Sequence, residues 1–327
     1  MTQVSSSEPQ PPPALACRLT VVGEALVDLV DSGNHQQFTA RPGGSPLNVA
    51  VGLARLGHPT AILARISADP FGQLLREHAR TNGIDLSAAP AAREPTTLAV
   101  VSLDTAGQPR YDFYRDGTAD WQWTPTELAR LPSDTAILHF GSLASWLQPG
   151  CRHITALVAQ LGDSALISYD PNIRPALLGA AENARPRIER CVALAHVVKA
   201  SDEDIRWLYP DHTTEAVATR WHSFGAQLVV ITHAAHGATA YRPDRPALHR
   251  PSPATRVIDT IGAGDAFTAG LLSGLVNADR RPATIDDPTL SDVLDQATLV
   301  AALTCERAGA DPPHIADVRI RRQIRPS

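Results

Sequence analysis

A glycine turn followed by an aspartate stands in the sequence IDTIGAGDAFTAGLLSGLV (residues 258–276). After Asp265 the apolar residues recur at helical spacing, so the backbone N–H groups of Gly262, Ala263 and Gly264 are expected at a helix N-terminus. Unpaired N–H groups and the helix dipole favour binding of an anion such as phosphate there. Phosphate binding does not need a carboxylate. Asp265 is therefore predicted to be the base for the group that attacks the phosphate, with an ordinary helix N-cap as the alternative.

The composition favours a small-molecule partner. The chain has 327 residues, of which 43% are hydrophobic, and its formal net charge is -5. It therefore has no overall positive field that would attract nucleic acid or an anionic membrane. Lys199 is the only lysine and alanine follows it, so no GxxxxGK[ST] phosphate loop exists. Any nucleotide site in this chain must work without that lysine.

The cysteines and the N-terminal segment indicate a cytoplasmic protein. The four cysteines are far apart and form no CxxC pair, which argues against a zinc site and predicts reduced thiols. Residues 1–17 lack the basic and apolar regions of a signal peptide. Their serine and proline content predicts a disordered tail.

Strands and helices alternate along most of the chain, which predicts an α/β fold with a mainly parallel sheet. The predicted strands lie within residues 17–30, 60–67, 135–141, 165–171, 188–201 (after a helix), 228–233 and 255–260. The predicted helices lie at residues 45–57, 69–84, 151–162, 216–226 and 262–276, with a last helix at 290–309.

Two segments interrupt this alternation. Residues 96–118 contain two β-type runs around the turn sequence DTAGQP, which predicts a hairpin, and residues 238–253 predict another. The polar segment 32–44 is expected to join the first hairpin in a small β-sheet lid over the site.

Six motifs in order resemble the ribokinase family of carbohydrate kinases, also called the PfkB family, and among its members they are most similar to bacterial fructokinases. They are GEALVD (23–28), PGGSPLNVAVGLARLG (42–57), FYRDGTAD (113–120), YDPNIRP (169–175), VKASDED (198–204) and DTIGAGDAF (259–267). The resemblance implies a ribokinase-like three-layer α/β/α domain over residues 18–327. It also implies an ATP-dependent kinase that phosphorylates a primary hydroxyl of a small sugar, with fructose as the first choice.

The resemblance assigns roles to residues on the sugar side and on the phosphate side. The implied sugar-binding residues are Asp28, Gly43, Gly44, Asn48, Arg115 and Asn172. Carboxylate and amide groups suit sugar hydroxyls, and paired glycines let the backbone approach them. Arg174 is assigned to the phosphoryl group in transfer, because its guanidinium is planar and permanently charged. The implied nucleotide-binding residues are Lys199, Ser201, Thr232, Gly237, Gly262 and Gly264.

The implied metal ligands include one departure from the family pattern. Relatives often carry an Asn-x-x-Glu motif whose Glu places Mg²⁺ through water, and Asp204 stands at that position here. The carbonyl groups of Asp259 and Ile261 are implied ligands of a monovalent cation such as K⁺. Residues 233–236 also depart from the pattern, because a glycine usually follows the threonine sooner. The choice of phosphate donor therefore stays open.

The sequence leaves several alternatives open. A 2-keto-3-deoxygluconate kinase would need an extra cation for the substrate carboxylate, supplied by Arg41 or Arg115. Another sugar or nucleoside kinase of the family is a further alternative. A sugar-sensing protein that lost phosphotransfer belongs to a different class, and a nicotinamide dehydrogenase lacks its GxGxxG motif. A homodimer formed through the lid is expected from the resemblance.

Overall fold

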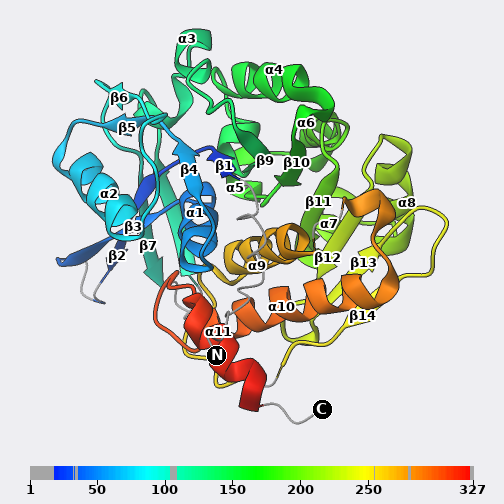
Figure 1. The fold of residues 1–327 in the computed structure, drawn as a ribbon. Helices are drawn as coiled ribbons and strands as arrows, with labels where there is room; N and C mark the ends of the chain where they lie inside the picture. Colours follow the sequence, from blue (N-terminus) through cyan, green and yellow to red (C-terminus); the bar gives the residue numbers. More distant parts are fainter. Residues whose placement is uncertain are drawn as a thin grey trace, which may run out of the picture.

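A mainly parallel β-sheet runs through the middle of the molecule (Figure 1). The computed structural model describes residues 18–324 apart from 32, 34–35, 104–108, 254 and 279–280, so the tail predicted at 1–17 lies outside the described residues. Within them, eight strands form this sheet in the order β14 (Leu248–Arg250), β13 (Ala238–Tyr241), β12 (Leu228–Thr232), β11 (Val197–Ser201), β10 (Leu166–Asp170), β9 (Thr135–Gly141), β1 (Arg18–Val22) and β4 (Thr60–Leu63). The strands from β4 to β12 are parallel, and β13 and β14 form the predicted antiparallel hairpin.

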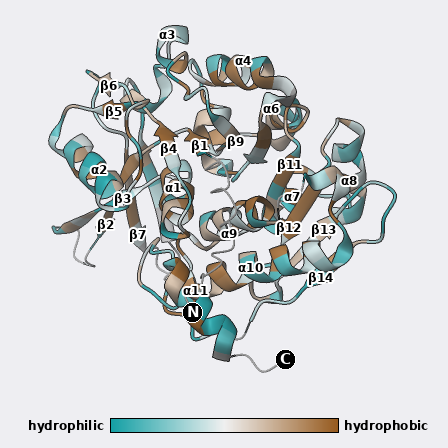
Figure 2. Ribbon diagram, in the orientation of Figure 1, coloured by the Kyte–Doolittle hydropathy of each residue, from teal (hydrophilic) through white to brown (hydrophobic). Residues whose placement is uncertain are grey.

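Helices cover both faces of this sheet, because alternate strand residues such as Val21 and Val22 are buried in two different hydrophobic clusters. One face is covered by α1 (Ser45–Arg55), α2 (Pro70–Thr81), α9 (Ala263–Asn277), α10 (Asp287–Cys305) and α11 (Ile315–Ile324). The other is covered by α3 (Pro125–Leu128), α4 (Cys151–Leu161), α5 (Pro175–Leu178), α6 (Ala181–Val192), α7 (Asp202–Leu208) and α8 (Thr214–Ser223). The predicted three-layer α/β/α architecture is confirmed. Figure 2 shows hydrophobic residues on β4, β11 and β12 and hydrophilic residues on the outer side of α2.

A second, smaller sheet lies beside the central one. It contains β3 (Phe38–Gly43), β2 (Leu26–Asp31), β7 (Leu98–Leu103) and β8 (Pro109–Tyr114), in that spatial order. The pair β7 and β8 is the predicted hairpin, with Leu98 opposite Tyr114. The shorter elements are the strand pair β5 (Ile66–Ser67) and β6 (Ala91–Ala92) and the 3₁₀ turns η1 (Ala119–Trp121), η2 (Leu143–Ser145), η3 (Gly162–Ser164), η4 (Ala234–His236) and η5 (Pro282–Thr284).

Residues 17–30 form two strands where the sequence predicted one. β1 pairs with β4 and β9 in the central sheet, whereas β2 pairs with β3 and β7 in the small sheet. The chain leaves the central sheet at Gly23, and Ala25 is fixed at the crossing because its N–H donates to Asp120 Oδ1 at 2.9 Å. Asp28 therefore lies in the small sheet, whereas the single strand predicted within residues 17–30 placed it in the same strand as β1. Similarly, residues 60–67 divide into β4 and β5.

The C-terminal region also differs from the prediction. The described residues at 255–260 form no strand, because the N–H groups of Ile258 and Asp259 donate to the carbonyl of Cys305 at the end of α10. The helix predicted as the last, at 290–309, corresponds to α10, and the unpredicted α11 follows it.

Close packing of α1 on α9 fixes the elements that form the site. A Cβ atom at Gly52 of α1 would lie 2.6 Å from the Ala269 Cβ of α9. The absence of a side chain at Gly52 therefore lets the two helices touch. Their N-terminal ends carry Asn48 and Asp265, which this contact brings together.

Candidate active site

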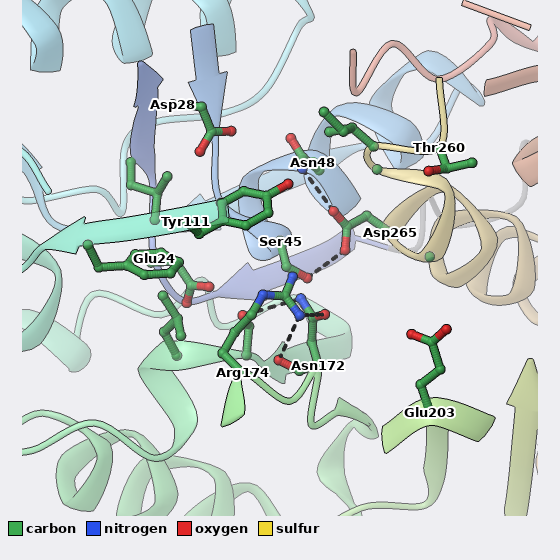
Figure 3. A pocket seen from close by; sticks show the side chains of 18 residues that line it. Glu24, Asp28, Ser45, Asn48, Tyr111, Asn172, Arg174, Glu203, Thr260 and Asp265 are labelled. Carbon is green, nitrogen blue, oxygen red and sulfur yellow. Dashed lines mark hydrogen bonds between the residues drawn. The ribbon is translucent and has the colours of Figure 1, made fainter. Parts of the chain in front are cut away.

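A cavity of about 430 Å³ lies where α1, α9, the small sheet and the loop after β10 meet. Figure 3 shows side chains from these elements pointing into it, among them Asp28, Asn48, Tyr111, Arg174 and Asp265. A volume of this size suits a small ligand.

Asp265 is held at the start of α9 by two side chains of α1. Ser45 Oγ donates to Asp265 Oδ1 at 2.6 Å, and Asn48 Nδ2 donates to Oδ2 at 2.8 Å. Asp265 is only 9% exposed, and this burial raises the pKa of its carboxyl, while the hydrogen bonds from Ser45 and Asn48 act in the opposite direction. The carboxylate has a fixed orientation and a basicity above that of an ordinary aspartate.

The N-terminus of α9 is formed by a left-handed glycine. Gly262 has φ of 75°, and a Cβ atom there would lie 2.6 Å from the Ala310 Cβ. The N–H of Ala263 donates to the carbonyl of Thr260 at 3.2 Å, so in this state it closes a turn. The expectation that all three N–H groups of 262–264 face an anion is therefore not met at Ala263 as the loop stands.

Asp28 faces the cavity from the small sheet and depends on a glycine of the neighbouring strand. A Cβ atom at Gly43 would overlap the Asp28 carboxylate. Burial raises the pKa of Asp28 to about 6, with Arg174 lowering it and Asp265 raising it further. Gly44, the next residue, lines the cavity directly.

The loop after β10 presents Asn172 and Arg174. Asn172 has φ of 40°, a left-handed conformation that asparagine tolerates better than most residues, and its N–H donates to Asp170 Oδ1 at 3.1 Å. Arg174 Nη1 donates to Asn172 Oδ1 at 2.8 Å. The arginine fork is thus directed into the cavity by its own loop (Figure 3).

A larger cavity of about 810 Å³ adjoins the first. Arg174, Glu203, Thr260 and Gly264 are among the residues that line both cavities. A ligand in the larger cavity can therefore contact a ligand in the smaller cavity directly, because no residue separates the two at this place.

A buried ion pair forms the inner wall of the larger cavity. Lys199 Nζ lies 2.9 Å from Asp170 Oδ2, and Lys199 is 5% exposed. Burial by itself lowers the pKa of Lys199, but the charge of Asp170 and the hydrogen bond to it raise the pKa above the ordinary value. The lysine is therefore charged at neutral pH and lies close to the start of α9, because a Cβ atom at Gly264 would lie 3.2 Å from its Nζ.

Asp204 is held by the backbone. It forms a capping box with Ser201, whose N–H donates to Asp204 Oδ2 at 3.0 Å, and Ile173 N–H donates to Oδ1 at 2.9 Å. Ser201 and Asp204 both line the larger cavity, while the exposed Glu203 lines both cavities. The described part of the chain holds no cluster of three or more His, Cys, Asp or Glu side chains suited to a metal ion.

The loop after β12 borders the larger cavity. Thr232, Ala234 and Ala235 line it, and Gly237 lines a small adjoining pocket of about 100 Å³ together with Thr232. His233 makes a contact of 3.0 Å between its Nε2 and Thr239 Oγ1.

The three predicted residues that remain, Asp259, Ile261 and Arg115, differ in how they relate to the two cavities. The Asp259 carboxylate accepts hydrogen bonds from Ile261 N–H at 3.0 Å and Gly309 N–H at 2.8 Å, so its side chain ties the glycine loop to the segment after α10. Ile261 lines the smaller cavity. Arg115 follows β8 and does not line the smaller cavity; its Nη1 lies 3.9 Å from Asp116 Oδ1.

Comparison with known proteins identifies the family. A model described as pfkB family carbohydrate kinase matches residues 17–316. The chain belongs to the pfkB family of carbohydrate kinases.

Related pfkB family proteins are similar over most of their length. A fructokinase of Rhizobium leguminosarum bv. trifolii is 38% identical over 277 residues, which cover 82% of this chain and 84% of that protein. The crystal structure of the Vibrio cholerae O395 fructokinase in its fructose, ADP and calcium ion bound form has a TM-score of 0.83 at 31% identity, covering 93% of this chain and 98% of that one. The Xylella fastidiosa fructokinase with bound ATP has a TM-score of 0.86 at 27% identity, covering 95% and 100%. The predicted ribokinase-like fold and carbohydrate kinase class are confirmed.

Glu24 and Ser45 are among the cavity residues of this pfkB chain that escaped the sequence reasoning. Glu24 is 1% exposed and lines the smaller cavity, with its Oε2 accepting from Ala144 N–H at 3.0 Å. Burial raises the pKa of Glu24 to about 7, although hydrogen bonds from Ser142 and nearby backbone groups lower it. The sequence signal that could have identified Glu24 as a site residue is its place in the motif GEALVD, which begins directly after β1. Ser45 was missed as well, although it stands in the same GGSPLN motif as Asn48.

Each helix in the described part of this pfkB chain is either too short or too polar to cross a membrane.

Proposed function

We propose that this pfkB family kinase transfers the γ-phosphate of ATP to a primary hydroxyl of fructose. The observation that carries the proposal is the position of Asp265. Its carboxylate lies in the smaller cavity, and Gly264, the residue before it, lines both the smaller and the larger cavity. A sugar in the smaller cavity and a nucleotide in the larger cavity would meet beside this carboxylate. The fructokinases named above support fructose as the sugar and ATP as the donor.

In the proposed reaction Asp265 accepts the proton of the attacking hydroxyl. The sugar oxygen forms a bond to the γ-phosphorus, the bond between that phosphorus and the β,γ-bridging oxygen breaks, and ADP leaves with the electron pair. The raised pKa of Asp265 favours proton transfer, because a carboxylate of higher basicity is a better acceptor. Ser45 and Asn48 keep the carboxylate aimed at the hydroxyl and not at the phosphate.

The charge of the smaller cavity supports a neutral sugar. Glu24, Asp28 and Asp265 line it, and Arg174 is its sole arginine or lysine among the described residues. Carboxylates accept hydrogen bonds from hydroxyls, whereas they would repel the carboxylate of 2-keto-3-deoxygluconate. Neither Arg41 nor Arg115 lines this cavity, so the extra cation which that substrate needs is not supplied here.

The residues between the cavities suit a phosphoryl group in transfer. Arg174 offers a planar fork of donors, Lys199 a buried positive charge, and Gly264 lies in the first turn of α9, where N–H groups lack intrahelical partners. When bound, Mg²⁺ would neutralise charge on the β- and γ-phosphates. It usually keeps several waters and needs few protein carboxylates, which fits Glu203 and Asp204 at the border of the larger cavity. K⁺ at the carbonyls of Asp259 and Ile261 stays a prediction.

The small sheet is proposed to act as a lid. Leu26, Asp28, Tyr111 and Phe113 all reach the smaller cavity from it, so its movement would open or close that cavity.

Phe38 and Tyr114 of the same sheet are 43% and 64% exposed, which supports the predicted homodimer through this surface. Light scattering of the purified protein tests the dimer. Use of ATP also fits the predicted cytoplasmic location.

A coupled assay of ADP release tests the activity. Fructose, ribose, 2-keto-3-deoxygluconate and nucleosides are compared, with and without Mg²⁺ and K⁺. The expected result is the highest kcat/KM with fructose, dependent on a divalent cation. Sugar binding by calorimetry without ADP release from any of them would overturn the proposal and favour the sugar-sensing alternative.

A further inference from the structure

A third cavity, of about 340 Å³, lies on the opposite side of the central sheet from α9 and goes beyond the proposed function. It is lined by the start of α4, one side of α6 and the segment after η2. None of its lining residues lines the sugar or nucleotide cavity. It is therefore a separate space and not an extension of the active site.

The charged residues of this cavity are all positive. Arg152 comes from α4, and Arg187 and Arg190 come from α6. No aspartate or glutamate lines the cavity, and no acid in the described part of the chain forms an ion pair with any of the three arginines. Other arginines of the described residues do have such a partner, as Arg220 has in Glu189 at 2.8 Å on the neighbouring α8. Arg152 Nε lies 3.4 Å from His153 Nε2, and Arg152 and Arg190 are exposed, but none of the three guanidinium groups is neutralised by an acid. Three such groups around one cavity form a site of concentrated positive charge.

A thiol in the cavity wall lies within reach of this charge. Cys151, the first residue of α4, is 7% exposed, and burial raises its pKa. All three arginines act in the opposite direction, because each stabilises the thiolate through its charge. The three positive charges therefore lie near enough to the cavity wall to act on a group inside it, where an anion would be bound.

The remaining lining residues indicate the size and polarity of the part of the ligand that carries the anionic group. Trp146 and Leu194 provide apolar surface, and Gln148 and Thr155 provide polar atoms. The volume is at the low end of the range for small-molecule sites, about 300–1,000 Å³. It exceeds the space of a single phosphate ion, which favours a compact ester.

We propose that this cavity binds a small molecule through a phosphate group, with Arg187 and Arg190 as the main ligands and Arg152 closing the site. Arginine forks match the geometry of phosphate oxygens. A dianion suits three arginines better than a single carboxylate does. The ligand is a phosphate monoester or free phosphate, and the experiment below distinguishes the two.

Titration calorimetry tests the site in the intact protein. The sugar and nucleotide cavities are first filled with fructose and a non-hydrolysable ATP analogue, so that added phosphate cannot bind there. Glycerol 3-phosphate and inorganic phosphate are then the probes, and glycerol is the neutral control. We expect saturable binding of the phosphates only. Tighter binding of glycerol 3-phosphate would identify an ester as the ligand, and equal binding would identify free phosphate.

The matched variants are R187Q/R190Q, R187K/R190K and R130Q. Arg130 is an exposed arginine outside this cavity and serves as the control. The Gln pair is expected to weaken binding at least about tenfold, because two charge-assisted contacts are lost. The Lys pair should lose less, and R130Q nothing. An unchanged urea unfolding midpoint of the Gln pair would show that it is folded, and this control does not depend on the kinase proposal. Absence of binding to the wild type, or equal affinity in the Gln pair, would overturn the site.

Discussion

The smaller cavity, proposed to bind the sugar, and the larger cavity, proposed to bind the nucleotide, are built in different ways; they are called the sugar cavity and the nucleotide cavity below. In the sugar cavity, the carboxylate of Asp265 is held by side chains of another helix, and that of Asp28 fits against a bare backbone at Gly43. In the nucleotide cavity two buried charged groups are held by protein partners, Lys199 by Asp170 and Asp204 by backbone N–H groups. Much of the remaining wall there consists of small residues such as Ala301 and Ala302.

This difference indicates how each ligand is selected. Side chains with fixed orientations on the sugar side can distinguish one hydroxyl pattern from another, since unpaired buried groups are costly. The nucleotide side offers shape and a fixed positive charge. Substitutions on the sugar side should therefore change KM for fructose or kcat, and those on the nucleotide side should change stability and KM for ATP.

The largest expected effect is on catalysis by D265N. The amide cannot accept the proton of the hydroxyl, so kcat should fall by about 10² to 10⁴ or more. Affinity for fructose, measured by calorimetry, should change little, because the amide oxygen can accept from Asn48 Nδ2 while the amide NH2 donates to the Ser45 hydroxyl.

The control for this variant is D116N, which changes a carboxylate that is 96% exposed beyond the end of β8. Its kcat should equal that of the wild type. Turnover by D265N within tenfold of the wild type would show that another group takes the proton.

On the nucleotide side, K199M should act first on stability. The change leaves Asp170 buried without its cation, which typically costs about 3–5 kcal/mol of unfolding free energy. Urea unfolding followed by tryptophan fluorescence measures the loss. The double variant K199M/D170N removes both charges and should regain most of the stability. If K199M alone unfolds at the same urea concentration as the wild type, the ion pair does not stabilise this wall.

On the sugar side, G43A should raise KM for fructose about 10- to 100-fold. The added methyl group displaces the Asp28 carboxylate, and loss of a buried hydrogen bond to a charged group typically costs about 1–3 kcal/mol. Steady-state kinetics with fructose and ATP varied in turn measure the effect. KM for ATP should stay within about twofold, and an equal rise in both constants would contradict the separation of the two cavities.

The smallest expected effect is a pH dependence of sugar affinity. The pKa of Asp28 is raised to about 6, so the carboxylate that accepts hydroxyl hydrogen bonds is lost as the pH falls through that value. The Kd for fructose should therefore increase below pH 6, by at most about tenfold per pH unit. Calorimetry from pH 5 to pH 8 measures it. D28N should bind more weakly and with a flatter profile, whereas a constant Kd in the wild type would exclude this role for Asp28.

The parts of the fold and site that follow local rules could be predicted from the sequence. The apolar spacing after Asp265 predicts α9, and the glycine and proline signals around residues 96–118 predict the hairpin of β7 and β8. Asn48 could be placed on α1 for the same reason. The roles of these residues remain predictions, which the variants above test.

The parts that depend on distant contacts could not be predicted. The break between β1 and β2 depends on which neighbouring strands pair with each half. The second hydrogen bond that the Asp204 carboxylate accepts comes from the N–H of Ile173, which lies in another loop. Glu24 faces the cavity because Ala144, far along the chain, fixes its carboxylate. None of these partners is near in sequence, so no local pattern could reveal the contacts, although the GEALVD motif marked the position of Glu24 itself.

The short crossing between β1 and β2 determines how the small sheet can move. β1 is fixed between β4 and β9, and residues 23–25 are all that separates it from β2. In the proposed lid movement, this short connection would let the small sheet swing but would leave it little room to slide. Glu24 lies on the pivot and would keep its position during such a swing, whereas Asp28, farther out along β2, would travel with the sheet. In such a movement the Glu24 carboxylate would stay in place in the sugar cavity, and the Asp28 carboxylate would enter it as the small sheet closes.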